Sequence, residues 1–321
     1  MKTCLIYGND GLDLDVTYNL SSFYKGLGFK VFFSGKLYNA DLLIVTRALD
    51  LEIDMSAFHY SLIHVYDYTG WDFDNFVRTV DHRMTFIFCT SETKKARLTE
   101  KLNFPPSQIF LALPPVDVIL WSKKLKDVKY HLIHIGNFKP ISDTDNIKVQ
   151  FNKAISFFKP HIWGKGWMVN NDLYHGKAGL FQVSSIYSMS EFALGLMYPF
   201  QREHTYSGRF WHAPLNGCYL LSEPGLYSQK VPGIIETDYS INDISEKIER
   251  NSDRKTLQKE SQEFWNKQYD ITLGYVASSL SNLKNNKFNA NYFFTFLWLR
   301  VFNILIKWYQ KAGLSTLFKR K

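Results

Sequence analysis

The chain has 321 residues and a formal net charge of +8, with 38 Lys and Arg against 30 Asp and Glu. The last acidic residue is Asp270, and the basic residues after it account for the whole excess. Those residues are Lys284, Lys287, Arg300, Lys307, Lys311, Lys319, Arg320 and Lys321. The body of the protein is therefore neutral, which excludes a generally basic coat for nucleic acid, and we expect no nucleic-acid partner. A composition that is 45% hydrophobic and 17% aromatic also excludes global disorder.

The amino terminus and the cysteines favour a reducing compartment. The first apolar run is too short for a signal peptide, and Asn9 and Asp10 end it. Cys4, Cys89 and Cys218 each lie in an apolar run, which predicts buried free thiols. No spacing of Cys and His is typical of a metal site, and we expect neither a metal nor a cofactor. We expect a cytoplasmic protein, or one attached to the cytoplasmic face of a membrane.

Residues 1–125 alternate short apolar runs with segments of helical length, which predicts a first α/β domain. Buried strands are expected at residues 3–7, 30–33, 42–46, 60–66, 84–89 and 109–113. Helices are expected at 14–27 and 91–102, and Ser91 can cap the second one. This alternation is typical of a parallel sheet that is covered by helices.

Pro114 and Pro115, followed by the polar stretch 122–129, predict a linker between two domains. A second domain of the same kind is expected over residues 126–281. Its strands are expected at 131–135, 161–163, 191–197, 218–222 and 234–237. Its helices are expected at 146–158, 206–215, 241–250 and 254–269. Two doubly wound, Rossmann-like domains of this kind face each other across a cleft, and ligands bind at the carboxyl ends of their strands.

The densest group of polar and glycine residues lies between 206 and 223. Ser207 and Gly208 stand where a helix is predicted to begin, and free backbone N–H groups at such a place favour an anion. Arg209 in the first turn can bind a phosphate with its planar guanidinium, and Gly217 suits the left-handed residue that ends a helix. An ordinary capped helix with a surface arginine explains the same residues, so physical chemistry alone leaves both interpretations open.

The run at 209–217, which reads RFWHAPLNG, resembles the donor-site signature of GT-B glycosyltransferases. The resemblance is to the form found in spore-maturation-type and other bacterial surface-polysaccharide glycosyltransferases. Residues 134–137 are similar to the first strand and glycine turn of the nucleotide-binding domain in that fold, and 162–167 to the next strand and turn. Residues 184–197 are similar to the stretch before the donor loop. The resemblance implies a GT-B glycosyltransferase whose second domain binds a nucleotide sugar.

The same resemblance implies which residues bind the donor. Ser207, Gly208 and Arg209 would face the diphosphate. The other donor-binding candidates lie at neighbouring strand ends and are Gly136, Asn137, Gly164, Lys165 and Glu223. His212 departs from the family, in which many members have a glutamate here that binds the nucleotide ribose. A histidine can hydrogen-bond a hydroxyl without being an obligate acceptor, so ribose binding and a retaining outcome do not follow from this position.

Glycosyl transfer with inversion needs a base near the acceptor hydroxyl and a group that neutralises the leaving diphosphate. In a two-domain cleft the base is expected from the first domain, at the carboxyl end of a strand. Asp67 and Asp10 are equal candidates, and each can also be an ordinary turn or cap residue. Asp-x-Asp triplets begin at Asp13, Asp72 and Asp143, but their contexts are unrelated, and we expect a metal-independent enzyme.

The last segment, residues 282–321, is predicted to form a basic, amphipathic helical tail. Its apolar core at 292–309 carries a narrow polar stripe when it is drawn as a helix. Such a helix suits the headgroup plane of an anionic membrane. The residues expected at the membrane are Arg300, Lys307, Lys311, Trp298 and Trp308. A helix packed on the protein, or an oligomer interface, would bury the same apolar face.

These features together predict a glycosyltransferase that works as a peripheral protein at the inner face of the cell membrane. It would move a sugar from a nucleotide sugar to a growing bacterial surface glycan of the lipopolysaccharide O-antigen or capsule type. The acceptor would be a glycan or a lipid-linked glycan. Two alternatives remain open at this point: a membrane-docked scaffold of the same fold that binds nucleotide without catalysis, and a phosphoribosyl or polyol-phosphate transferase.

Overall fold

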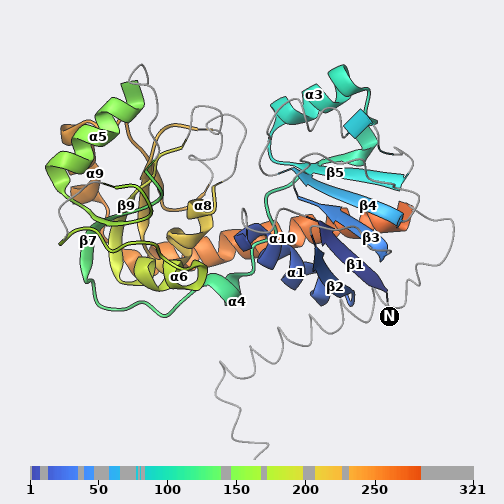
Figure 1. Cartoon of the computed structure of the whole chain (residues 1–321), viewed down its shortest axis with the longest axis horizontal. Coiled ribbons are helices and arrows are strands. Elements are labelled where there is room, and N and C mark those ends of the chain that lie inside the picture. The colour runs from blue at the N-terminus through green and yellow to red at the C-terminus, as the bar shows by residue number, and fades with distance from the viewer. Residues whose placement is uncertain are drawn as a thin grey trace, which may run out of the picture.

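Two parallel β-sheets form the centres of two domains that stand side by side in the computed structural model (Figure 1). The structure describes residues 2–7, 14–34, 40–46, 58–65, 77–78, 80, 84–138, 146–167, 172–197, 207–225 and 231–282.

The first described sheet has six strands in the order β2-β1-β3-β4-β5-β6, and every pairing in it is parallel. Its strands are β1 (Thr3–Tyr7), β2 (Lys30–Ser34), β3 (Ala40–Val45), β4 (Phe58–Val65), β5 (Thr85–Cys89) and β6 (Ile109–Leu111). Alternate residues serve opposite faces, as the pleat requires: Ile6 packs with α1 (Leu14–Gly26), while Leu5 packs on the side of α3 (Glu92–Leu102). The sheet is therefore buried on both sides, which explains the unbroken apolar runs in its sequence.

The second described sheet has five parallel strands in the order β11-β10-β9-β7-β8. They are β7 (Tyr130–Ile135), β8 (His161–Trp163), β9 (Ser190–Leu194), β10 (Tyr219–Ser222) and β11 (Ile234–Glu236). One face is covered by α5 (Asn146–Phe158) and α9 (Ile241–Arg250), and the other by α6 (Leu180–Ser188) and the first half of α10 (Arg254–Asn282).

The strand order of the second sheet repeats that of the first. In each sheet the first strand of the domain is flanked by the second and third strands, so the order reverses at β1 and again at β7. Ligands of open α/β sheets bind in the crevice beyond the carboxyl ends of the strands at such a reversal. The prediction of two doubly wound domains is confirmed. In the second domain, the topology predicts a ligand site next to the residues that follow β7.

Local sequence signals explain where several of the elements begin and end. Ser91 caps α3, because its side-chain oxygen accepts a hydrogen bond from the Lys94 backbone N–H at 3.2 Å. After the short 3-10 turn η3 (Pro106–Gln108), Asp117 caps α4 (Val118–Trp121) in the same way, accepting from the N–H groups of two residues of its first turn. The sequence predicts the first of these caps, whereas α4 lies in a segment that was expected to be only a linker.

Two helices differ from their predicted bounds by more than one residue. The helix expected at 206–215 is a single α turn, α8 (Arg209–His212), followed by the 3-10 turn η4 (Pro214–Asn216), since Pro214 has no N–H to continue an α-helical ladder. Gly217 ends this segment with a φ of 65°, the left-handed conformation that its glycine predicts. The helix expected at 254–269 continues to Asn282 as part of α10.

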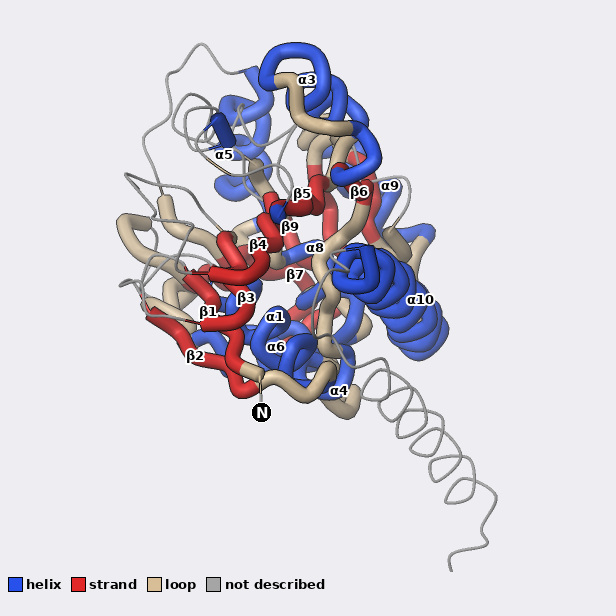
Figure 2. The backbone as a smooth tube through the Cα atoms, turned by 90° about the vertical axis from the view of Figure 1, so that its right-hand side faces the viewer, coloured by secondary structure: helices blue, strands red, loops and turns tan. Residues whose placement is uncertain are grey.

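The continuation of α10 is explained by what it packs against. The helix starts on the second domain and runs across to the first (Figure 1), and Figure 2 views it close to end-on. Tyr269 packs edge-to-face on Phe23 of α1, Tyr275 stacks on Phe110 of β6, and the Thr272 hydroxyl donates to the Leu113 carbonyl at 3.1 Å. One apolar cluster therefore passes through both domains along this helix.

The cysteines are buried and free, as predicted. Burial raises the pKa of Cys89 to about 11 and raises the pKa of Cys4 and Cys218 as well, so the thiols stay protonated. Within the described ranges, no helix combines the length and the apolar character needed to cross a bilayer. The predicted tail and its residues Arg300, Lys307, Lys311, Trp298 and Trp308 lie outside the described residues.

Candidate functional site

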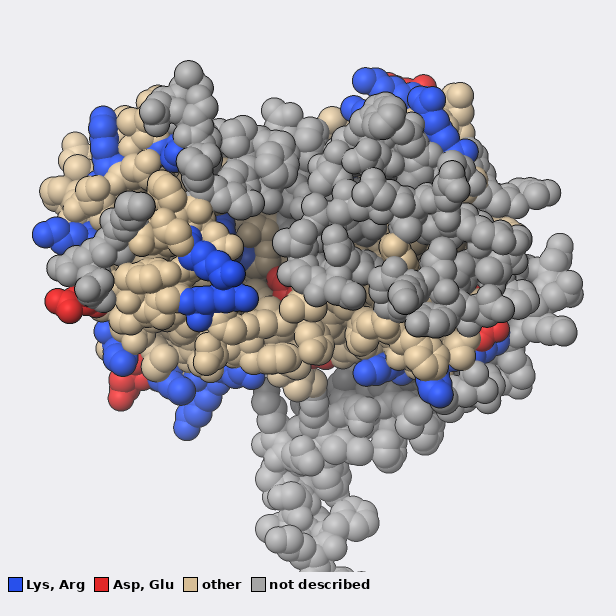
Figure 3. Space-filling view, viewed as in Figure 1, with Lys and Arg blue, Asp and Glu red and all other residues tan. Residues whose placement is uncertain are grey.

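Five donor-binding candidates follow the carboxyl ends of β7, β8 and β10, which meet at one edge of the sheet: Gly136, Asn137, Gly164, Lys165 and Glu223. The other four, Ser207, Gly208, Arg209 and His212, belong to α8 or directly precede it. We call the residues after these strands, with Arg209 and His134, the carboxyl-edge site. Figure 3 shows a hollow between the two domains, with Lys and Arg side chains on its wall on the side of the second domain.

Two turns of this site are fastened to each other. The Lys165 N–H donates to the Asn137 side-chain oxygen at 2.9 Å, and the Phe138 N–H donates to the Lys165 carbonyl at 2.8 Å. The Trp167 indole N–H donates to the Gly136 carbonyl at 2.7 Å. The turns after β7 and β8 therefore form one rigid unit, in which the Asn137 side chain links the two turns through a hydrogen bond.

Gly164 is a position that no other residue can occupy without rearrangement. Its φ of 150° lies in a region that is almost confined to glycine. A Cβ at this position would also come within 1.9 Å of the Gly136 carbonyl oxygen. The glycine is therefore required by the close approach of the two turns to each other.

Arg209 connects the end of β7 to the segment after β9. Its Nε donates to the Ile135 carbonyl at 3.0 Å, and its Nη1 donates to the Leu196 carbonyl at 2.8 Å. Within the described part of the chain, Nη2 makes no hydrogen bond. The guanidinium is thus held in a fixed orientation with one nitrogen left over, which is a suitable arrangement for binding an anionic oxygen.

His134 belongs to the same site, although the sequence did not single it out as a binding residue. It lies at the end of β7 with 3% of its surface exposed, and its Nδ1 is 2.7 Å from the Leu194 carbonyl oxygen. Burial, and next the positive charge of Arg209, lower the pKa of His134 to about 3. A polar residue inside an apolar strand, two positions before a glycine turn, is the only signal that the sequence offered.

Glu223 is fully buried at the end of β10. One carboxylate oxygen accepts from the Met197 N–H at 2.8 Å, and the other accepts from the Tyr239 hydroxyl at 2.6 Å. Burial, and next the carboxylate, raise the pKa of Tyr239 well above its usual value. Glu223 therefore holds the segment after β9 in place, and its carboxylate is turned inward rather than toward the hollow.

His212 lies where the two domains meet. It is 4% exposed, its Nδ1 is 3.3 Å from the Ser184 hydroxyl, and its ring packs edge-to-face on Trp121. Its Nε2 is 3.6 Å from Oδ2 of Asp15, a residue of the first domain, and has no hydrogen-bond partner among the described residues. The ring is thus buried in the contact between the two domains.

Ser207 and Gly208 lead into α8 beside the same contact. The Arg209 N–H is 3.4 Å from the Ser207 hydroxyl oxygen. A Cβ at Gly208 would come within 2.1 Å of Oδ2 of Asp15, so a carboxylate of the first domain lies against this turn. Because α8 has only four residues, the dipole of a long helix is not available here, and anion binding depends on side chains such as Arg209.

The two predicted catalytic residues, Asp67 and Asp10, lie outside the described residues. No group of three or more His, Cys, Asp or Glu side chains suited to hold a metal ion occurs in the described ranges.

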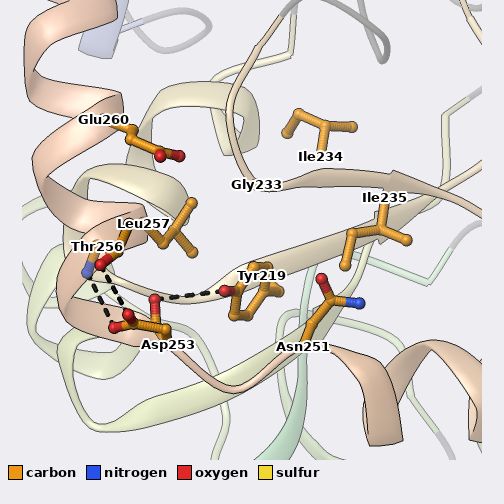
Figure 4. Close-up of a pocket in the computed structure, with 9 residues that line it drawn as sticks. All are labelled: Tyr219, Gly233, Ile234, Ile235, Asn251, Asp253, Thr256, Leu257 and Glu260. Carbon is orange, nitrogen blue, oxygen red and sulfur yellow. Dashed lines mark hydrogen bonds between the residues drawn. The ribbon is translucent and has the colours of Figure 1, made fainter.

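A cavity of about 320 Å³ lies elsewhere on the second domain (Figure 4). Its wall consists of Tyr219, Gly233, Ile234, Ile235, Asn251, Asp253, Thr256, Leu257 and Glu260. Tyr219 begins β10 and Gly233 precedes β11, so the cavity opens at the amino ends of these strands, opposite the carboxyl-edge site. It contains none of the predicted donor-binding residues.

Comparison with known proteins gives a match in structure alone. No family model matches the sequence, and no curated protein resembles it. AviGT4, a glycosyltransferase involved in avilamycin A biosynthesis, superposes with a TM-score of 0.58 at 10% identity, over 88% of this chain and 98% of that one. An α-glucosyltransferase solved with UDP-glucose and DNA containing an abasic site gives 0.58 at 11% identity, over 88% and 100%. The DNA-modifying enzyme β-glucosyltransferase gives 0.53 at 16% identity, over 89% and 100%.

These structures span both domains of the present chain, and all three are glycosyltransferases. The chain therefore has the two-domain GT-B fold, as the sequence predicts. At identities of 10–16% the likeness concerns the fold, and the chemistry must be argued from the site.

Proposed function

We propose that the protein is a glycosyltransferase that moves a sugar from a nucleotide sugar to an acceptor bound between its domains. The observation that carries the proposal is Arg209, a fixed guanidinium with one unused nitrogen at the reversal point of the second sheet. Neighbours of the same fold were solved with UDP-glucose, which makes uridine diphosphate the first ligand to test.

The proposed reaction is displacement at the sugar carbon that bears the diphosphate. A base removes the proton of the acceptor hydroxyl, the new glycosidic bond forms, and the bond to the diphosphate oxygen breaks. Arg209 would stabilise the negative charge that develops on the leaving diphosphate. Asp67 and Asp10 remain the proposed bases, and the proposal needs no metal.

The proposed acceptor is a growing bacterial surface glycan of the lipopolysaccharide O-antigen or capsule type, free or lipid-linked. The basic tail supports this assignment, because it would hold the enzyme at the anionic inner face of the membrane where such glycans are extended. The resemblance of residues 209–217 to surface-polysaccharide transferases supports it as well.

DNA is a second candidate acceptor, because one neighbour is a DNA-modifying enzyme and another was solved with DNA. The neutral body of this chain argues against it, since a protein that tracks a phosphate backbone needs many basic contacts. Turnover of UDP-glucose with duplex DNA, compared with turnover on a lipid-linked glycan, separates the two acceptors.

The donor site can be tested by thermal unfolding with a panel of nucleoside diphosphates. A ligand at one hundred times its Kd adds about 2.7 kcal/mol to the free energy of unfolding. We expect this stabilisation in the wild type and its loss in Arg209→Ala. Arg254→Ala is the matched control, because Arg254 also donates to backbone carbonyls but at the opposite edge of the sheet. Stabilisation by no nucleotide at all would refute the proposal.

The two alternative functions make different predictions in the same experiments. A scaffold of this fold binds nucleotide but releases no nucleoside diphosphate with any sugar donor or acceptor. A phosphoribosyl or polyol-phosphate transferase is stabilised by its own donor and leaves nucleotide sugars intact.

A further inference from the structure

The tautomer of His134 is fixed by its surroundings. Its Nδ1 lies 2.7 Å from the Leu194 carbonyl oxygen, which can only accept a hydrogen bond, so Nδ1 carries the proton. The ring packs edge-to-face on Phe151 and on Trp167, which fixes its plane. In the neutral ring the other nitrogen, Nε2, then carries a lone pair and can only accept.

Nε2 lies beside Gly136, at a position that the missing side chain of the glycine leaves clear. A Cβ built on Gly136 would lie 2.9 Å from His134 Nε2 and also 2.9 Å from Arg209 Nη2. A side chain at this position would displace both nitrogens, so the glycine lets an acceptor and a donor lie close together over the same backbone turn. In the described part of the chain, neither nitrogen has another hydrogen-bond partner.

We infer that the carboxyl-edge site recognises a hydroxyl group of its ligand through His134 Nε2 and Arg209 Nη2, above Gly136; the inference rests on the proposed donor site. A hydroxyl can donate to Nε2 and accept from Nη2 at the same time. An ionised phosphate oxygen has no proton to donate, so it would meet the lone pair of Nε2 without a bond. In a nucleotide sugar the hydroxyl belongs either to the ribose or to the transferred sugar.

The neutral ring is the state that matters at physiological pH. The cationic group that faces the ring is Arg209 on α8, and the packed side chains of Phe151 and Trp167 carry no charge. A positive neighbour and burial both oppose protonation of the imidazole. His134 is thus suited to act as an acceptor that discriminates between hydroxyl and phosphate groups.

His134→Asn tests the role of Nε2 apart from that of Nδ1. An Asn amide can still donate to the Leu194 carbonyl but has no atom at the position of Nε2. The probe is whichever of the uridine, guanosine, cytidine and adenosine diphosphates binds tightest, used with its 2′-deoxy and 3′-deoxy analogues and with its glucose ester. We expect His134→Asn to weaken one of these ligands about tenfold, as measured by calorimetry, the loss of one hydrogen bond. His134→Gln, whose amide reaches the position of Nε2, should restore most of the affinity.

The ligand series identifies the hydroxyl. If the ribose is recognised, one deoxy analogue binds the wild type about tenfold more weakly and is insensitive to His134→Asn. If the transferred sugar is recognised, the substitution weakens the glucose ester and leaves the bare diphosphate unchanged. His64→Asn is the control, since His64 is also fully buried but lies in the first domain, and it should leave every Kd unchanged.

Three outcomes would overturn the inference. Equal binding by the wild type and His134→Asn across the whole series would refute it while the proposed donor site stands. An affinity that rises about tenfold per pH unit from pH 7 to 5, and loses this rise in His134→Asn, would mean that a protonated Nε2 donates to a phosphate. Absence of nucleotide binding by the wild type would refute the proposed function and this inference with it.

Discussion

An arginine ties together each edge of the second sheet, but the two arginines are used differently. At the amino edge, Arg254 donates from all three guanidinium nitrogens, to the carbonyls of Gly217 at 2.9 Å, Lys126 at 3.1 Å and Ser188 at 2.7 Å. At the carboxyl edge, Arg209 donates from two nitrogens to described carbonyls. Both side chains connect the segments next to β7 and β9, so their mechanical roles are alike.

The difference separates an arginine that only holds the fold together from one that we propose also binds a ligand. A guanidinium whose three nitrogens all meet backbone carbonyls still has two of its five N–H groups, but no nitrogen that is free of the backbone. One that keeps a whole nitrogen free, at the edge where α/β sheets bind their ligands, can hold the backbone and bind a ligand. The location of Arg209 and its free nitrogen together support the proposed binding role, and neither can be read from the residue type.

The largest effect that we expect concerns Gly164, which determines how closely the two turns at the carboxyl edge approach. Gly164→Ala places a Cβ 1.9 Å from the Gly136 carbonyl oxygen at a φ of 150°, and should cost at least about 3 kcal/mol of unfolding free energy in urea titrations. Gly176→Ala is the control, because Gly176 has a φ of 74° with nothing within 4 Å of its Cβ. It should cost about 1–2 kcal/mol. Equal costs would show that the close approach is not important.

The two arginines should rank in opposite order for stability and for ligand binding. Arg254→Ala leaves three carbonyls without their donor and should cost about 3 kcal/mol, at about 1 kcal/mol for each bond. Arg209→Ala removes two such bonds and should cost about 2 kcal/mol. Urea midpoints measured with and without nucleotide give both rankings. If both variants lose the response to nucleotide, the division between the two edges is wrong.

The smallest expected effect compares buried histidines of the two domains as the pH falls. Burial lowers the pKa of His64 and of His134 to about 3, so each ring stays neutral in the folded protein but is protonated below about pH 6.5 in the unfolded chain. Above pH 6.5 the two rings do not change the free energy of unfolding with pH. Below it, each ring lowers the free energy of unfolding by about 1.4 kcal/mol per pH unit, because the unfolded chain binds the proton. Between pH 7 and 5 the free energy of unfolding should therefore fall by about 2 kcal/mol less in His64→Gln than in the wild type.

The control for this measurement is His161→Gln. His161 is only partly buried and its pKa is lowered less far, by burial and by the neighbouring His175 and Lys129. Its replacement should change the fall in unfolding free energy between pH 7 and 5 by a smaller amount. An acid profile of His64→Gln that follows the wild type would show that the buried ring titrates normally.

The sequence predicted the fold well because both sheets are buried on two sides. Apolar runs such as 131–135 and 84–89 then mark the strands almost residue by residue. It also located the turns at Gly136 and Gly164 and the arginine between them. It could not predict that α10 continues past Tyr269, because the burial of that segment depends on the distant first domain.

The roles within the site were harder to predict for a physical reason. Whether a carboxylate such as Glu223 faces a ligand or the interior depends on the position of Tyr239, and whether His212 meets solvent depends on Asp15 in the other domain. Such contacts join residues that are far apart in the sequence. His134 went unnoticed for the same reason, since its importance comes from Gly136 and Arg209 beside it.

The path of α10 also bears on the order in which the protein is made. Residues 3–111 supply the first sheet, but one face of that sheet is completed by residues 269–280, which are synthesised much later. At 5–20 residues per second, roughly 10 to 30 s of translation separate the two segments. During that interval the apolar surface that α10 covers in the folded protein, around Phe23 and Phe110, stays uncovered on the amino-terminal domain.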